Sequence, residues 1–193
     1  MNNQRRKIRF LVSWVACLWV LEAFDQIFLR GRLDLYGIQP RSVGGLRGIL
    51  FAPFLHGDFG HLASNTIPLL VLGWLVLLPG VTEFVEVTLL VMLLGGVGTW
   101  LFGAPNTVHI GASGVIFGYL GFLLLRGVFQ RSVTSIVIAL GVGLLYGGVL
   151  WGILPRVAHV SWEAHLCGFL SGATVAWGMA RGAGGRRPRR HSL

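Results

Sequence analysis

Six apolar stretches follow one another along the chain, and each is close to the length that crosses a lipid bilayer. A hydrocarbon core about 30 Å thick requires roughly 20 consecutive apolar residues in a helix. The fourth stretch is the shortest of the six. We therefore predict an all-α membrane protein, built as a six-transmembrane-helix bundle in a single domain over residues 1–193. The predicted spans cover residues 8–29, 61–78, 84–102, 112–125, 133–154 and 162–180.

The composition favours lipid rather than water as the solvent. Charged residues make up 12% of the 193 residues, about half of the share that is usual in soluble domains. Such a chain lacks the polar side chains that would cover a globular surface in water. The two cysteines, Cys17 and Cys167, lie in apolar stretches without the spacing of a metal site. Neither a disulfide framework nor a cysteine metal centre is therefore predicted.

The net charge of +9 raises the question of nucleic-acid binding. The basic residues, however, crowd the two ends of the chain, which is the pattern of membrane topology signals. With the N-terminus inside, eleven of the sixteen Lys and Arg residues fall in cytoplasmic segments. We therefore predict that both termini are cytoplasmic, that residues 182–193 form a basic tail that attracts anionic lipid, and that nucleic acid is not a partner. The terminal basic residues are Arg5, Arg6, Lys7, Arg9, Arg181, Arg186, Arg187, Arg189 and Arg190.

Strongly polar side chains inside three predicted spans mark a candidate site, because such groups are costly at membrane depth. They are His61 and Asn65 in the second span, Ser113 in the fourth and His165 in the sixth. All three spans run from outside to inside in the predicted orientation. At about 1.5 Å per residue, Asn65, Ser113 and His165 lie roughly 20–24 Å above the inner boundary of the core. We therefore expect them to share one level, about 6–10 Å below the outer face.

Small residues repeat on the two spans that carry Ser113 and His165, at the spacing of one helix face. Stripes of this kind let membrane helices approach closely. Ser113 lies beside one stripe and His165 beside the other, so we expect packing of the stripes to bring the pair within reach. The stripes are Gly111, Gly114, Gly118 and Gly121 in the fourth span and Ala164, Gly168, Gly172 and Ala176 in the sixth.

The residue types at this level meet the needs of nucleophilic acyl transfer. A serine hydroxyl needs a neighbouring base, and histidine is the natural base near neutral pH. The developing oxyanion needs donors, which the backbone N–H of Ser113, the Asn65 amide and the His61 imidazole would supply. Glu163, two residues from His165, should point to another face of its helix. The sequence therefore predicts a dyad rather than a triad.

Three motifs carry these residues. The stretch GASG occupies residues 111–114, residues 56–65 read H-x-x-x-x-H-x-x-x-N, and residues 164–172 read A-H-x-x-G-x-x-x-G. In motif order, spacing and six-span layout, essentially the whole chain resembles the rhomboid family of intramembrane serine proteases. Two features depart from that family. The first outer loop lacks the Trp-Arg pair common in relatives, and Ser161 stands where relatives often have Gly.

The resemblance implies a serine endopeptidase that cleaves transmembrane segments of other membrane proteins near the outer side of the bilayer, beside a small residue. It implies Ser113 as nucleophile and His165 as general base, with His61, Asn65 and the Ser113 backbone as the oxyanion hole. It implies no metal ion and no organic cofactor. The expected partners are transmembrane substrates and the lipid bilayer, in a prokaryotic plasma membrane. The supporting positions are Gly111, Gly114, Phe117, Ala164 and Gly168, of which Phe117 matches an aromatic position that packs against the catalytic histidine.

Other interpretations of the same residues stay open. A glycine-flanked serine in a membrane helix commonly bonds its own backbone, and an intramembrane asparagine or histidine commonly bonds a neighbouring helix. At the level of function, one alternative is a catalytically inactive relative that binds membrane proteins as an adaptor. Another is a metal transporter that uses neutral imidazole ligands. Its candidate ligands would be His56, His61, His109, His159 and His165, although His56 is better explained as a structural residue of the first loop.

Overall fold

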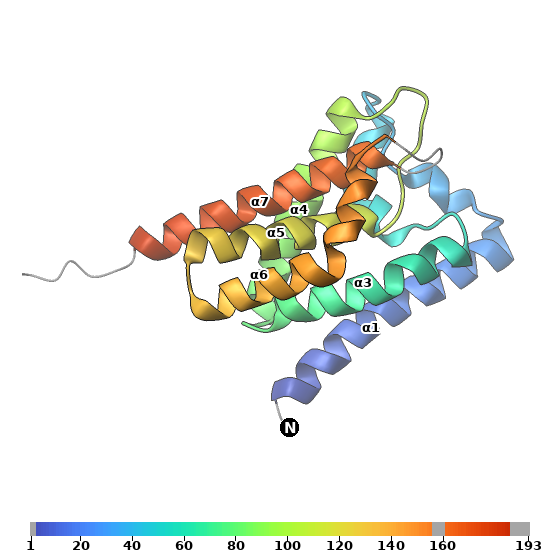
Figure 1. Ribbon diagram of the computed structural model, residues 1–193. Coiled ribbons are helices and arrows are strands. Elements are labelled where there is room, and N and C mark those ends of the chain that lie inside the picture. Colours follow the sequence, from blue (N-terminus) through green and yellow to red (C-terminus); the bar gives the residue numbers. More distant parts are fainter. Residues whose placement is uncertain (1–2, 156–160, 186–193) are drawn as a thin grey trace, which may run out of the picture.

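The computed structural model describes residues 3–155 and 161–185, and in these ranges the protein is helical (Figure 1). The one pairing of extended segments there is an isolated antiparallel bridge between Ile38 and His109. The long helices are α1 (Asn3–Phe24), α3 (Phe59–Leu77), α4 (Val81–Phe102), α5 (Ser113–Gln130), α6 (Val133–Tyr146) and α7 (Trp162–Gly185). The short ones are η1 (Asp25–Leu29), η2 (Arg32–Tyr36), η3 (Gly44–Arg47), α2 (Gly48–Phe51), η4 (Ala52–Phe54) and η5 (Gly147–Ile153).

Five helical segments in the described ranges are long and apolar enough to cross a membrane, which makes this a multi-pass membrane protein. They are Asn3–Leu29, Phe59–Leu77, Val81–Phe102, Ser113–Gln130 and Val133–Ile153. The sixth predicted span corresponds to α7, which is long enough at 24 residues. Its first turns carry Glu163 and His165 and much of the rest is Gly, Ala, Ser and Thr, so its apolar character is weaker. Its passage through the bilayer stays a prediction.

Two helices differ in extent from the predicted spans. The predicted span at residues 112–125 becomes the longer helix α5, Ser113–Gln130. Arg126 does not end this helix, because its guanidinium forms an ion pair with Glu83 on α4. The span at residues 133–154 divides into α6 and the 3₁₀ helix η5, and the change falls at Gly147 and Gly148. Most of the predicted basic tail, residues 186–193, lies outside the described ranges.

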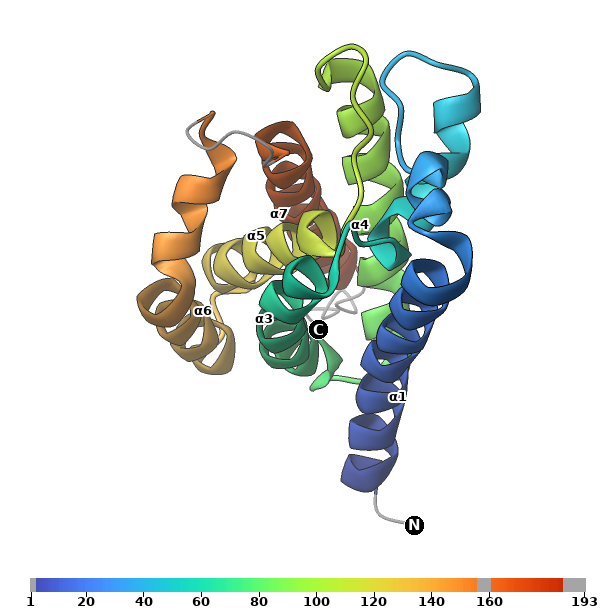
Figure 2. The same ribbon diagram turned by 90° about the vertical axis from the view of Figure 1, so that its right-hand side faces the viewer.

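Helix α5 is the centre of the bundle and contacts α3, α4, α6 and α7 (Figures 1 and 2). Its tightest neighbour is α7, because the two glycine stripes face one another there. A β-carbon added to Gly168 would collide with the carbonyl group of Gly114, and one added to Gly172 would collide with the carbonyl of Gly118. The backbones are therefore in direct contact. This contact brings the first turn of α5 beside the first turn of α7.

The segment that precedes α5 is held by the first long loop. The bridge joins Ile38 and His109 through N–H···O bonds of 3.0 and 2.9 Å. Two residues further on, the N–H of Gly111 donates to the carbonyl of Ala52 in η4 at 2.9 Å. The loop between residues 30 and 58 therefore serves as a scaffold for the start of α5.

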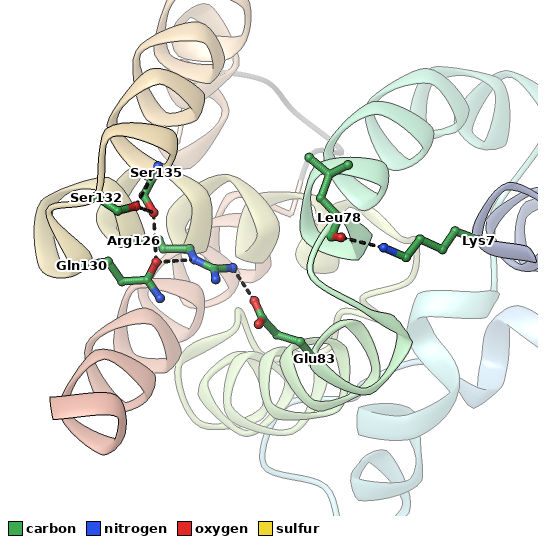
Figure 3. Close-up of polar contacts among 7 residues, drawn as sticks. All are labelled: Lys7, Leu78, Glu83, Arg126, Gln130, Ser132 and Ser135. Carbon is green, nitrogen blue, oxygen red and sulfur yellow. Dashed lines mark hydrogen bonds and ion pairs between the residues drawn. The ribbon is translucent and has the colours of Figure 1, made fainter. Parts of the chain in front are cut away.

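The other end of α5 is tied by a polar network (Figure 3). Arg126 pairs with Glu83 on α4 and donates to the Gln130 side chain at 2.8 Å. The Ser135 hydroxyl on α6 donates to the same Gln130 oxygen at 2.9 Å. Three helices are thus joined at the end of α5 that lies farthest from Ser113, so the two ends of this central helix are fixed by different means.

The backbone contact yields a prediction about stability. Gly168→Leu forces α5 and α7 apart, and we expect the free energy of unfolding in mixed detergent micelles to fall by about 3 kcal/mol, the upper end of the usual range for overpacked sites. Gly178→Leu is the matched control, because a β-carbon at Gly178 on the same helix has nothing within 4 Å. Equal stability losses in the two variants would contradict the close packing of α5 on α7.

Candidate active site

Ser113 is the first residue of α5, and the local backbone explains how it is presented. Gly111, two residues earlier, has a φ of +111°, a conformation that glycine adopts without the steric cost met by other residues. The chain turns there and enters the helix at Ser113. The N–H groups of the first helical turn have no acceptor within their own helix. The Ser113 hydroxyl and backbone N–H therefore lie together at an open helix start.

His165 lies in the first turn of α7, directly across the glycine contact from Ser113. Its Nε2 is 2.9 Å from the Ser113 Oγ, a normal hydrogen-bond distance. The imidazole is buried, with 8% of its residue surface exposed. The two side chains that sequence analysis singled out from separate spans are therefore in direct contact, in the geometry expected of a nucleophile and its base.

The carbonyl of Gly152 determines which ring nitrogen of His165 carries the proton. His165 Nδ1 lies 2.9 Å from the Gly152 oxygen, and a carbonyl oxygen only accepts hydrogen bonds. We therefore assign the proton of the neutral ring to Nδ1. Nε2 is left with a lone pair directed at Ser113, so the serine O–H donates to it. A backbone carbonyl thus fixes the tautomer and orientation of this ring, which is one of the two roles of the acidic side chain in a triad.

The ring of Phe117 sets the plane of the same imidazole. Phe117 lies one turn after Ser113 on α5, and its ring stacks on that of His165 with centroids 4.1 Å apart and planes 10° apart. The stack and the Gly152 bond restrict the ring in different directions. Within the described ranges, no carboxylate is hydrogen-bonded to His165.

His61 and Asn65 lie beside Gly111. A β-carbon on Gly111 would be 2.7 Å from His61 Cε1 and Nε2 and 3.7 Å from Asn65 Nδ2. Asn65 is buried, and its Nδ2 has no hydrogen-bond partner among the described residues. Buried amide donors are usually paired, so this group is a donor available to a ligand. The donors predicted from the second span therefore adjoin the turn that precedes Ser113.

Two further histidines hold the backbone around this site. His56 is fully buried and its Nε2 accepts the N–H of Ala112 at 3.3 Å. Burial, with the neighbouring His61, lowers the pKa of His56 to about 4, so the ring is neutral and able to accept this bond near neutral pH. His56, predicted to be structural within the first loop, also bonds the turn before Ser113.

His109 links the segments that precede α5 and α7. Its Nε2 is 2.9 Å from the Thr107 hydroxyl, and its Nδ1 is hydrogen-bonded to the hydroxyl of Ser161. Burial also lowers the pKa of His109. Ser161, which departs from the family pattern, therefore has a role in joining two loops. His, Cys, Asp and Glu side chains in the described ranges form no group of three that could hold a metal; His159 lies outside those ranges.

A small apolar cavity of about 40 Å³ opens beside Ser113. This volume holds no more than a few water-sized groups. The cavity lies next to the Ser113 hydroxyl and has room for a small side chain only. Its wall includes Val91, Met92, Gly95, Ile110, Ala164 and Gly168.

This all-helical membrane fold fits a rhomboid protein. Residues 44–182 match the Rhomboid domain, and the chain belongs to the rhomboid family, whose characterised function is intramembrane proteolysis. The family membership predicted from the three motifs is thus confirmed.

Bacterial proteins are among the relatives. The chain is 46% identical over 175 residues to an uncharacterized protein from Mycobacterium tuberculosis, covering 86% of this chain and 72% of the relative. It is 44% identical over 190 residues to an uncharacterized protein from Mycobacterium leprae, covering 91% and 75%. It is 25% identical over 179 residues to a Bacillus subtilis protein provisionally named as a rhomboid protease, covering 88% and 86%.

The Gly152 contact was not visible to sequence analysis, and it yields a prediction. A β-carbon at Gly152 would lie 2.9 Å from Phe117 Cζ and 3.4 Å from His165 Nδ1. We expect Gly152→Val to displace the imidazole and slow phosphonylation of Ser113 by a fluorophosphonate about 100-fold, since a displacement near 1 Å has effects of that size. Gly148→Val is the control within η5, because a β-carbon at Gly148 has nothing within 4 Å. An unchanged rate in Gly152→Val would show that the reaction does not depend on the position in which Gly152 and Phe117 hold the imidazole.

Proposed function

We propose that the protein is an intramembrane serine endopeptidase in which Ser113 is the nucleophile and His165 the general base. The observation that carries the proposal is the 2.9 Å contact between Ser113 Oγ and His165 Nε2, together with the Nδ1 bond that leaves Nε2 unprotonated. A serine bonded only to its own helix would have no such partner. Membership of the rhomboid family supports the same reaction class.

The reaction would proceed by acyl transfer. Ser113 Oγ attacks the scissile carbonyl carbon while its proton passes to His165 Nε2. The carbon–nitrogen bond then breaks, and Nε2 returns the proton to the leaving amine. Water attacks the acyl-enzyme with Nε2 again taking the proton. The resulting tetrahedral intermediate collapses as Nε2 gives that proton back to Ser113 Oγ, which leaves as the free hydroxyl. One peptide bond is thus exchanged for a carboxyl and an amine, with no cofactor consumed.

The oxyanion formed in each step would be held by three donors. The Ser113 N–H lies at the helix start, and Asn65 Nδ2 is a buried donor without a partner in the described ranges. His61 lies against the same turn as Asn65. Donors that are already in place stabilise the transition state without reorganisation. The free amide of Asn65 is the strongest support for this assignment.

The substrate would be a transmembrane segment with a small residue at the cleaved bond. The cavity beside Ser113, at about 40 Å³, excludes large side chains. With α7 as a sixth span and both termini cytoplasmic, α5 runs from the outer side of the bilayer to the inner side. Ser113, at its first residue, then lies near the outer side, and Arg126 and Gln130 lie near the inner side. The bacterial relatives support a prokaryotic plasma membrane as the location.

The alternative is an inactive adaptor that binds membrane proteins without cleaving them. A direct assay of substrate cleavage distinguishes this function from that of a protease. We expect the purified chain in proteoliposomes to cleave a single-span test substrate, and Ser113→Ala and His165→Ala to reduce cleavage to background. Asn65→Ala should lower the rate about 10²–10³-fold, the usual effect of removing one oxyanion donor. Ser64→Ala, an exposed serine that bonds its own helix, should remain active. Substrate binding without cleavage by the wild-type protein, or cleavage that survives Ser113→Ala, would contradict the protease assignment.

A further inference from the structure

A groove of about 710 Å³ runs between α1 and α4. Its volume is within the range of about 300–1,000 Å³ that is typical of ligand sites. One wall is a single face of α1 that begins at Arg6 and ends at Cys17. The other is a single face of α4 that begins at Val81 and ends at Met92. The groove is therefore a long slot between two membrane helices.

The two walls run in the same direction from a common end. Lys7 Nζ donates to the carbonyl of Leu78 at 2.6 Å (Figure 3), which holds the start of α1 beside the turn that leads from α3 into α4. Each wall then extends over eleven residue steps, roughly 16 Å at about 1.5 Å per residue. This length is close to half of a hydrocarbon core about 30 Å thick. The slot therefore has the depth of one leaflet.

The charged and the apolar residues that line the groove lie in different parts of it. The basic side chains that line it, Arg6 and Arg9, are at the end where α1 and α4 begin, and no acidic residue lines it. Lys7, which lies between them in sequence, is buried and directed toward Leu78. Beyond the arginines the lining is mostly apolar. Its floor is formed by Phe84, which makes edge contacts with Phe10 at 5.6 Å and Trp14 at 5.3 Å between ring centroids.

We propose that this groove binds one anionic phospholipid, with its phosphate on Arg6 and Arg9 and an acyl chain along Phe84. Guanidinium groups bind phosphate oxygens in a fork geometry, and the apolar slot of leaflet depth accepts hydrocarbon. A transmembrane helix from another protein would also bury the apolar wall, but it would not require two positive charges at one end. The lipid is the occupant that matches both the charge and the length of the slot.

The site is tested by native mass spectrometry of the delipidated full-length chain, titrated with dioleoylphosphatidylglycerol or dioleoylphosphatidylcholine. We expect one phosphatidylglycerol to bind more tightly than any phosphatidylcholine. The double variant Arg6→Gln/Arg9→Gln should lower phosphatidylglycerol affinity roughly 25-fold, since each basic residue near an anionic headgroup contributes about a fivefold preference. The matched control, Arg5→Gln/Arg32→Gln, removes the same charge from exposed positions outside the lining and should bind as the wild type does.

A second measurement keeps the test valid if the double variant is poorly folded. Phosphatidylglycerol with brominated acyl chains should quench the fluorescence of Trp14 in the wild-type chain, and this component should be absent from Trp14→Phe. The proposal would be overturned if the wild-type chain bound the two lipids with equal affinity. It would also be overturned if the double variant and its control lost the same affinity for phosphatidylglycerol, or if the brominated lipid did not quench Trp14. Efficient oxidative cross-linking through the exposed Cys17 would also overturn it, because a second copy of the chain would then occupy the groove.

Discussion

The contact between the backbones of Gly114 and Gly168 is the constraint on which the candidate site depends. A side chain at Gly168 would collide with the Gly114 carbonyl, so the two helices meet at a distance that only glycine permits. Ser113 directly precedes Gly114 in sequence, and His165 lies three residues, about one helical turn, before Gly168. Their 2.9 Å contact is therefore a consequence of how the two helices pack. In a bilayer, where apolar burial gives little drive for helices to associate, such packing is a main source of specificity.

The orientation of His165 comes from its surroundings rather than from an acidic partner. The Gly152 carbonyl accepts a hydrogen bond from the Nδ1–H group, and the Phe117 ring stacks on the imidazole face. A buried carboxylate at membrane depth would cost several kcal/mol unless paired, whereas a carbonyl satisfies the same N–H without adding a charge. The backbone contact thus holds the serine and the histidine together, and the carbonyl orients the histidine without adding a charge.

Sequence reasoning could predict the parts of this arrangement that depend on side-chain pattern. The apolar stretches located the helices, and the glycine stripes predicted which faces of α5 and α7 meet. The shared depth of Ser113, His165 and Asn65 singled out the residues of the site. The role of Gly152 could not be predicted in this way, because it acts through a carbonyl that every residue possesses.

The other features that the sequence did not predict also depend on contacts between residues far apart in the chain. His56 bonds the N–H of Ala112, which is 56 residues away, and such a pairing follows from the path of the first loop rather than from local pattern. The length of α5 was underestimated because Arg126 reads as a boundary until its partner Glu83 is known. The groove between α1 and α4 likewise arises only when two faces that are distant in sequence are set side by side.

The central claim is that Ser113 is activated by His165, and mass-spectrometric mapping of a fluorophosphonate adduct tests it most directly. The account predicts a single phosphonylated residue, Ser113, in the wild-type chain and no adduct in His165→Ala at the same exposure. Modification of a different serine, or labelling of Ser113 at an unchanged rate in His165→Ala, would contradict it.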